Sequence, residues 1–427
     1  MTEKPERKIQ MDEYTYEKTP WRNEKWYTSA WNFDESIKEM WHFADKISIH
    51  DVTLRDGEQQ SRVALTKDQK VAIAEKLSEL GVQRIEAGMP AVSRDDYEAI
   101  EEMLKRNLKS DIFCFARCMA SDAQLAADLG VKGVVMEIPA NELLIKYGYR
   151  WETQKAIDAA INATNMAHEK GLYVVLFLID FSRADWDYAT KFIDAVNEHG
   201  YFDALACVDT MGALNPMGAY RMVRSVKERY PDKKVEFHGH DDFGIGSANT
   251  VMAAMAGADV LHTTVGAMGE RAGNVSYEDV AMTLKMMFDQ DVGIDFEKIC
   301  PTAEFVMDLA HTYCRPNKGI IGPVIAEMES GLPIGWFERI KEVDPLILFP
   351  YRFPFTGHKD ITYTIGKGSG APTIRHYLKE LGLPTDNDAF VKELNVAVKN
   401  MAIMMTHSLT VEQFRELAEK IYAKYRG

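Results

Sequence analysis

The residues with the clearest chemical potential are His238 and His240, which stand one position apart at the end of an apolar run. Alternate side chains of a β-strand point to the same face, so the two imidazoles would face the same way. Two neutral imidazoles on one face are a ready pair of ligands for a divalent metal. The plainer alternative is a pair of polar residues at the end of a strand.

Two further residues would complete such a site. Asp56, in Arg55-Asp56-Gly57, offers a carboxylate, and one carboxylate with two imidazoles is a common set for Zn, Mn, Mg, Fe or Co. Asn274 could add a neutral oxygen. The remaining coordination positions would suit a 2-oxo or 2-hydroxy acid, whose oxygen the metal would polarise. Taken alone, Asp56-Gly57 is also ordinary turn chemistry.

Other polar side chains at predicted strand ends are candidates for handling that acid. Arg55 could hold an anionic oxygen through charge-assisted hydrogen bonds, and the hydroxyl of Thr210 could bind a carboxylate. Glu86 is a candidate for orienting Arg55, although it could equally form a salt bridge in the wall. Gln59 and Arg117 are further candidates for substrate binding.

These residues are placed by a regular alternation of strands and helices. The predicted strands are 46–50, 84–87, 112–117, 133–138, 173–179, 204–208, 235–240 and 260–264. The predicted helices between them are 67–80, 94–106, 121–129, 151–170, 186–198, 217–229 and 245–256. Eight strand–helix units of this length predict a TIM barrel, with its active site at the carboxyl ends of the strands.

Composition limits the classes of function. The 427 residues are 46% hydrophobic and 27% charged, as in ordinary globular proteins, and the net charge of −15 argues against nucleic-acid or membrane partners. We find no long apolar run, signal-peptide core or phosphate-binding glycine motif. Five cysteines without a CxxC pair are typical of a reduced, cytoplasmic protein, and Cys114 and Cys118 are expected to be buried thiols.

The two ends of the chain differ from the barrel. Residues 1–45 are rich in aromatic side chains, which disordered tails lack, and we interpret them as an arm that packs on the barrel or on a partner subunit. Residues 46–300 would be the catalytic barrel. Residues 301–427 would be a linker and a small helical subdomain, with helices at 303–313, 376–381 and within 389–425. The arm and the subdomain together predict a homodimer or a higher homo-oligomer.

Several motifs, taken together, resemble a known family. They are TLRDGEQ after the first strand, DTMG after the sixth, HGHDDFG on the seventh and GERAGN after the eighth. In this order they resemble the isopropylmalate and homocitrate synthases, in the TIM-barrel superfamily that includes 3-hydroxy-3-methylglutaryl-CoA lyase. GKGSG at 366–370 resembles the GKHSG of synthase second domains.

The resemblance implies a metal on Asp56, His238 and His240, with Asn274 near or on it. It also implies that Arg55 and Thr210 contact the oxo-acid. Synthases of this family join acetyl-CoA to a 2-oxo acid: a base removes a methyl proton, the enolate attacks the ketone and the thioester is hydrolysed. The implied cofactors are a divalent metal (Mg, Mn, Zn or Co) and, as co-substrate, acetyl-CoA or another acyl-CoA.

This sequence departs from the family at its proton-transfer positions. Where synthases carry HESGIH, this chain reads Met328-Glu329-Ser330-Gly331-Leu332-Pro333, without either histidine. The fourth strand carries Glu137-Ile138-Pro139 in place of a small hydroxyl-bearing end, and the fifth ends in Ile179-Asp180. We therefore expect a divergent member of the family. Glu137 is the first candidate for the base that removes the methyl proton, and His358 is the second.

Three functions agree with these observations. The first is a metal-dependent acyltransferase that condenses an acyl-CoA with a 2-oxo acid to a 2-hydroxy dicarboxylate. The second is a lyase or carboxyltransferase that uses the same enolate chemistry. The third is a barrel that binds an oxo-acid without catalysing a reaction. The absence of the two family histidines is the reason to retain this alternative.

Overall fold

The computed structural model describes residues 19–425, and Tyr14 and Tyr16 of the predicted aromatic arm lie outside this range. The described chain forms two compact units. One contains residues 30–315 and 319–321, and the other contains residues 19–29, 316–318 and 322–425. No helix within residues 19–425 has the length and apolarity needed to cross a membrane.

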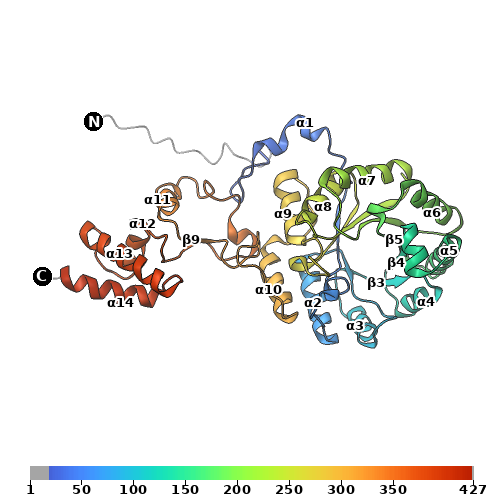
Figure 1. Ribbon diagram of the computed structural model, residues 1–427, viewed down its shortest axis with the longest axis horizontal. Helices are drawn as coiled ribbons and strands as arrows, with labels where there is room; N and C mark the ends of the chain where they lie inside the picture. Colours follow the sequence, from blue (N-terminus) through green and yellow to red (C-terminus); the bar gives the residue numbers. More distant parts are fainter. Residues whose placement is uncertain (1–18, 426–427) are drawn as a thin grey trace. The chain divides into compact units, whose positions relative to one another are not determined.

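The first unit is a closed barrel of eight parallel strands (Figure 1). The strands are β1 (Ser48–Asp51), β2 (Arg84–Glu86), β3 (Asp111–Arg117), β4 (Gly133–Pro139), β5 (Tyr173–Ile179), β6 (Ala204–Asp209), β7 (Lys234–Gly239) and β8 (Val260–Thr263). Each strand pairs with the next in the sequence, and Ser48 of β1 pairs with Val260 of β8 to close the ring. The predicted TIM barrel is confirmed.

Helices follow the strands and surround them, as Figure 1 shows. They are α2 (Lys67–Leu80), α3 (Arg94–Lys105), α4 (Ala120–Leu129), α5 (Thr153–Glu169), α6 (Trp186–His199), α7 (Pro216–Arg229), α8 (Gly246–Met255), α9 (Tyr277–Phe288) and α10 (Ile299–Leu309). Local signals set their ends. Thr66 and Gln69 form a capping box at the start of α2, and Gly81 ends it in the left-handed conformation, with φ of +99°.

One predicted helix is in the wrong place. The prediction of 303–313 is corrected to α10 (Ile299–Leu309), whose buried face is formed by Ile299, Ala303 and Val306. His311 has a left-handed backbone, with φ of 50°, so the helix cannot continue to residue 313. The helix α9 was not predicted, and Tyr277 at its start is fully buried.

Part of the predicted arm packs within the barrel unit. Phe33 and Phe43 contact Trp41 through edge-to-face ring pairs, and Trp41 packs on Phe288 of α9 with ring centroids 5.7 Å apart. The backbone N–H of His42 donates to the carbonyl of Met255. Aromatic contacts of this kind explain why residues 33–43 adopt an ordered path.

The second unit is mostly helical. It contains α11 (Gly331–Ile340), α12 (Ala371–Glu380), α13 (Asp388–Met405), α14 (Val411–Tyr422) and a parallel pair of short strands, β9 (Glu327–Met328) and β10 (Thr362–Tyr363). Its core contains Ile334, Leu378, Phe390, Leu394 and Phe414. The predicted helix 376–381 begins earlier, at Ala371, because Gly370 and Pro372 form its N-terminal turn.

The interior of the barrel has two chemically different halves. Strands β3 to β6 contribute an apolar cluster of Phe113, Phe115, Val135, Val175, Phe177, Ala204, Ala206 and Val208. The other four strands contribute the buried ionisable side chains His50, Arg84, Glu86, Glu236, His238 and His262. Barrel interiors are usually filled by branched aliphatic side chains, so the polar half is a feature of this particular chain.

Two buried carboxyl groups, Asp51 of β1 and Glu278 of α9, should make stability depend on pH. Burial raises the pKa of Asp51 and of Glu278 to about 7 each. Each group ionises near pH 4 in the unfolded chain but only near pH 7 in the folded protein. Their contribution to the free energy of unfolding is therefore complete below pH 4 and is lost as the pH rises through 7.

The variant Glu278→Gln tests this dependence. A glutamine is neutral at every pH, so the variant should gain stability relative to the wild type as the pH rises from 4 to 7. The expected gain is on the order of 3 kcal/mol, because one pKa unit corresponds to about 1.4 kcal/mol. Urea unfolding across this range measures the difference, and parallel curves for the two proteins would contradict the assignment.

Candidate metal centre

The structure brings Asp56, His238 and His240 together. The Nε2 atoms of His238 and His240 lie 3.1 and 3.7 Å from Oδ2 of Asp56, and the ligand atoms of the three residues lie within 4.8 Å of one another. The two histidines come from β7 and the residue just beyond it, and Asp56 lies in the turn after β1. All three side chains are buried. The strand alternation thus places both imidazoles on one face, as predicted.

The protonation of these side chains fits a cation. Burial lowers the pKa of His240 to about 4, and burial also lowers the pKa of His238, so both rings are neutral at physiological pH. Burial raises the pKa of Asp56, but Arg55 and the two histidines outweigh burial and hold the pKa well below its usual range. Neutral imidazoles and an ionised carboxylate are the forms that bind divalent metals.

The hydrogen bonds of His240 and Asn274 are also compatible with a bound cation. Nδ1 of His240 lies 3.2 Å from the carbonyl of Gly273, so a proton on Nδ1 leaves Nε2 with a free lone pair toward Asp56. Asn274 pairs with His240 in an isolated β-bridge, and its Nδ2 donates to the carbonyl of Met268. Its buried Oδ1 has no hydrogen-bond partner among the described residues. An unpaired buried oxygen beside the triad is consistent with a metal or substrate contact.

Two glycines make room for Asn274 in the loop after β8. A Cβ on Gly269 would lie 2.2 Å from Nδ2 of Asn274, and a Cβ on Gly273 would lie 1.9 Å from the carbonyl oxygen of Ala267. Both residues have positive φ angles, of 147° and 95°. No other residue fits at either position without moving the loop, because these φ values favour glycine.

Arg55 lies against the triad. Its Nε hydrogen-bonds to Oε1 of Glu86, its Nη1 lies 3.4 Å from Oδ1 of Asp56, and its guanidinium lies 3.9 Å above the ring of Phe115. Its Nη2 is buried and has no hydrogen-bond partner in the described part of the chain. A buried guanidinium N–H without a partner is the donor that an anionic substrate oxygen would need.

Glu137 lies on β4, beside Arg117 of β3 in the register of the sheet. Burial raises the pKa of Glu137, although the positive charges of Arg55 and Arg117 act in the opposite direction. Its carboxyl group makes no hydrogen bond to the rest of the described chain. A carboxyl group with a raised pKa near Arg55 is a candidate for proton transfer.

The other predicted substrate contacts differ in their surroundings. The hydroxyl of Thr210 accepts a hydrogen bond from the backbone N–H of Asp180, which leaves its own proton free to donate. Gln59 is exposed and lines a cavity of about 290 Å³ that Arg55 also lines. Arg117 is half-exposed, and Asp122 binds it through two hydrogen bonds of 2.8 and 3.0 Å, so its guanidinium is already occupied.

His358 belongs to the second unit. Its Nδ1 lies 3.0 Å from the carbonyl of Lys359, and its Nε2 lies 3.1 Å from the carbonyl of Gly322. Carbonyl oxygens only accept, so a neutral imidazole can donate to one of the two. The ring is therefore held by backbone groups of its own unit.

Sequence reasoning missed a buried network inside the barrel. His50 contacts Glu86, whereas Arg84 and His262 both contact Glu236. The alternation of side chains along β1 was the available signal, because it directs His50 into the barrel and Asp51 away from it. Charged partners for Glu86 and Glu236 come from separate strands, so their pairing was not visible in the sequence.

Comparisons with known proteins identify the family of this chain. The model of the HMGL-like family matches residues 46–306. A 2-isopropylmalate synthase from Caldanaerobacter subterraneus subsp. tengcongensis is 31% identical over 383 residues, which cover 88% of this chain and 96% of that relative. A homocitrate synthase from Methanopyrus kandleri is 31% identical over 389 residues, covering 90% of this chain and 96% of that relative.

A solved structure shares the fold. An HMG-CoA lyase from Bacillus subtilis superposes with a TM-score of 0.57 at 22% identity, covering 64% of this chain and 96% of that one. At this identity the likeness concerns the barrel alone.

Proposed function

This chain belongs to the HMGL-like family, and from that premise we propose that it is a divalent-metal-dependent acyltransferase that condenses an acyl-CoA with a 2-oxo acid. The resemblance inferred from its motifs is confirmed by the synthases it matches. The observation that carries the proposal is the buried Asp56–His238–His240 triad beside Arg55, whose Nη2 has no partner in the described chain.

Each side chain would have a defined task. A divalent ion held by Asp56, His238 and His240, with Asn274 as a further oxygen donor, would polarise the keto oxygen of the oxo-acid. Arg55 would donate from Nη2 to the oxygen on which negative charge develops. The hydroxyl of Thr210 would donate to the carboxylate of the oxo-acid.

The reaction moves a proton from the acyl methyl group and releases CoA as the leaving group. Glu137 would take a proton from the acyl methyl group, and the resulting enolate would form a carbon–carbon bond with the keto carbon. The keto oxygen gains a proton to become the hydroxyl group. Water then hydrolyses the thioester, which releases free CoA and a 2-hydroxy dicarboxylate.

The barrel rim offers a place for a large anionic co-substrate. A cavity of about 720 Å³ is lined in part by Arg62, Arg271 and His311, and by Gly269 and Gly273 of the loop that carries Asn274. Four of its non-glycine lining residues, Arg62, Ala267, Arg271 and His311, have positive φ, a conformation that concentrates at ligand sites. Asp242 already binds Arg271 through two hydrogen bonds of 2.9 Å, so the exposed Arg62 is the basic side chain that best supports binding of the phosphates of CoA.

The proposal is tested by release of free CoA from acetyl-CoA with a panel of 2-oxo acids, before and after metal removal and restoration. Release that depends on both the oxo-acid and the metal supports condensation. Cleavage of 2-hydroxy dicarboxylyl-CoA substrates without net condensation would instead indicate a lyase, and binding without turnover a silent barrel. The variant Arg62→Glu should raise the KM for acetyl-CoA while the KM for the oxo-acid stays unchanged.

Arg55→Lys should lower kcat/KM for the oxo-acid while the fold is kept. Lysine keeps the charge but cannot hold Glu86 and an oxygen of the substrate with one planar group. The expected loss is about 2–4 kcal/mol in the barrier, as for an oxyanion donor. Arg22→Lys is the matched control, because Arg22 is also buried against a carboxylate, that of Asp344, but belongs to the second unit. A wild-type rate in Arg55→Lys would remove Arg55 from the site.

We further propose that the enzyme is a cytoplasmic homodimer or higher homo-oligomer. All five cysteines are free thiols, and Cys114 and Cys118 are buried as predicted. Val396, Ile403 and Met404 expose one apolar face of α13, of a kind that marks interfaces. Light scattering at micromolar concentration should give a multiple of the chain mass, and the double variant Ile403→Glu, Met404→Glu should lower it. A monomeric wild type would refute the proposal.

A further inference from the structure

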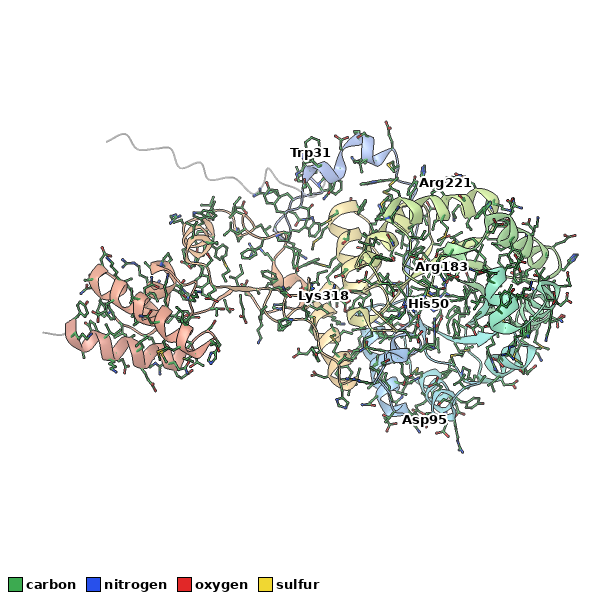
Figure 2. The ribbon with its side chains drawn as sticks, viewed as in Figure 1. Trp31, His50, Asp95, Arg183, Arg221 and Lys318 are labelled. Carbon is green, nitrogen blue, oxygen red and sulfur yellow. The ribbon has the colours of Figure 1, made fainter. Side chains whose placement is uncertain are left out.

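His50 shares a carboxylate with Arg55. Oε1 of Glu86 accepts from Nε of Arg55, and Oε2 of Glu86 lies 3.0 Å from Nε2 of His50. The side chains of His50 and Glu86 are completely buried, so water cannot replace either contact. Figure 2 shows His50 inside the barrel.

The proton on His50 can be located. Burial raises the pKa of Glu86, but Arg55 and His50 outweigh burial and bring it to about 2, so the carboxylate is ionised and only accepts. Burial lowers the pKa of His50 to about 3, so its ring is neutral and carries one proton. That proton must be on Nε2, and Nδ1 has no hydrogen-bond partner in the described chain.

The ring of His50 is itself held in place. It stacks on His262 with ring centroids 4.5 Å apart and meets the ring of Phe113 edge to face. His262 contacts Glu236 at 2.7 Å, and Arg84 binds Glu236 through both carboxylate oxygens. The buried groups of β7, β8, β1 and β2 therefore form one packed series that leads to Arg55.

A carboxylate bound through one oxygen can turn about its last torsion, whereas bonds to both oxygens fix its plane. We propose that His50 is a positioning residue: its Nε2–H fixes the plane of the Glu86 carboxylate, and the carboxylate in turn sets the direction in which Arg55 presents Nη2. The part of this inference in which Nη2 contacts a 2-oxo acid rests on the proposed function. The part in which His50 and Glu86 set the orientation of Arg55 is independent of that function.

Three variants separate positioning from simple core packing. His50→Phe keeps an aromatic ring and removes the donor, and His50→Gln restores an N–H donor. Tyr230→Phe is the matched control, because Tyr230, at the end of α7, is also buried and its hydroxyl also donates to a carboxylate, that of Asp194, outside the series that leads to Arg55. Should His50→Phe fail to fold, His50→Met supplies a flexible apolar side chain without a donor.

We expect His50→Phe to lower kcat/KM for the oxo-acid by about 10–100-fold, as is typical when a partner of an active-site residue is lost. Metal content should be unchanged, and His50→Gln should recover most of the loss. Tyr230→Phe should lower the melting temperature while kcat/KM stays near the wild-type value. Equal kinetic losses in the two phenylalanine variants, or no loss in His50→Phe, would overturn the inference.

A crystal structure of His50→Phe, or of His50→Met, gives a readout that needs no turnover. The guanidinium of Arg55 should be rotated relative to Glu86, while Arg55 in Tyr230→Phe keeps its wild-type orientation. An unmoved Arg55 would overturn the positioning role even in an active enzyme. A rotated Arg55 in a protein that releases no CoA would sustain it and would contradict only the proposed function.

Discussion

His238→Ala should lose its metal and lower turnover by about 10³–10⁴-fold or more. Within residues 19–425, Asp56, His238 and His240 are the carboxylate and imidazole side chains grouped at ligand distance, so removing His238 leaves two of them. A metal that polarises a carbonyl supplies several kcal/mol of transition-state stabilisation, and each 1.4 kcal/mol corresponds to a factor of ten in rate.

Elemental analysis and turnover should be measured on the same preparations. His199→Ala is the matched control, because His199 is exposed at the end of α6 and should change neither quantity. A melting temperature close to the wild-type value would separate metal loss from unfolding. Full metal occupancy in His238→Ala would show that the triad is not the metal site.

Glu137→Gln should lower the rate of deuterium exchange at the acyl methyl group by about 10²–10⁴-fold, the usual contribution of a general base. Glutamine keeps the size of the side chain but cannot accept the proton. Metal content should be unchanged, because Glu137 is not part of the triad. Burial raises the pKa of Glu137, which makes its carboxylate a stronger base. The loss of exchange should therefore be measured at neutral pH.

The same exchange measurement distinguishes Glu137 from the second candidate base. Glu142→Gln changes an exposed carboxylate five residues further along the chain and should exchange at the wild-type rate. His358→Ala should have a smaller effect than Glu137→Gln, because backbone carbonyls surround both nitrogens of His358. Normal exchange in Glu137→Gln with loss of exchange in His358→Ala would make His358 the base in place of Glu137. Normal exchange in both variants would show that neither residue is the base.

Much of the barrel could be read from local patterns. The strand at 173–179 and the helix at 67–80 have the bounds that were predicted, because a short β-branched run and a capped amphipathic run are local signals. The helix predicted at 303–313 failed because its true end depends on the left-handed backbone of His311. Histidine adopts that conformation more often than most residues, but the residue type alone does not say which histidine will adopt it.

The candidate site also has features that local patterns predict and features that they do not. The sequence by itself determined that His238 and His240 share a face and that Asp56 and Asn274 follow barrel strands, because strand alternation and the parallel barrel direct these positions to one end. Only the tertiary structure decided which side chains hold one another: Asp122 occupies Arg117, and His50 and Arg55 share Glu86. Such pairings join separate elements across the closed barrel, and a buried charge takes whichever partner the three-dimensional packing brings within hydrogen-bond distance.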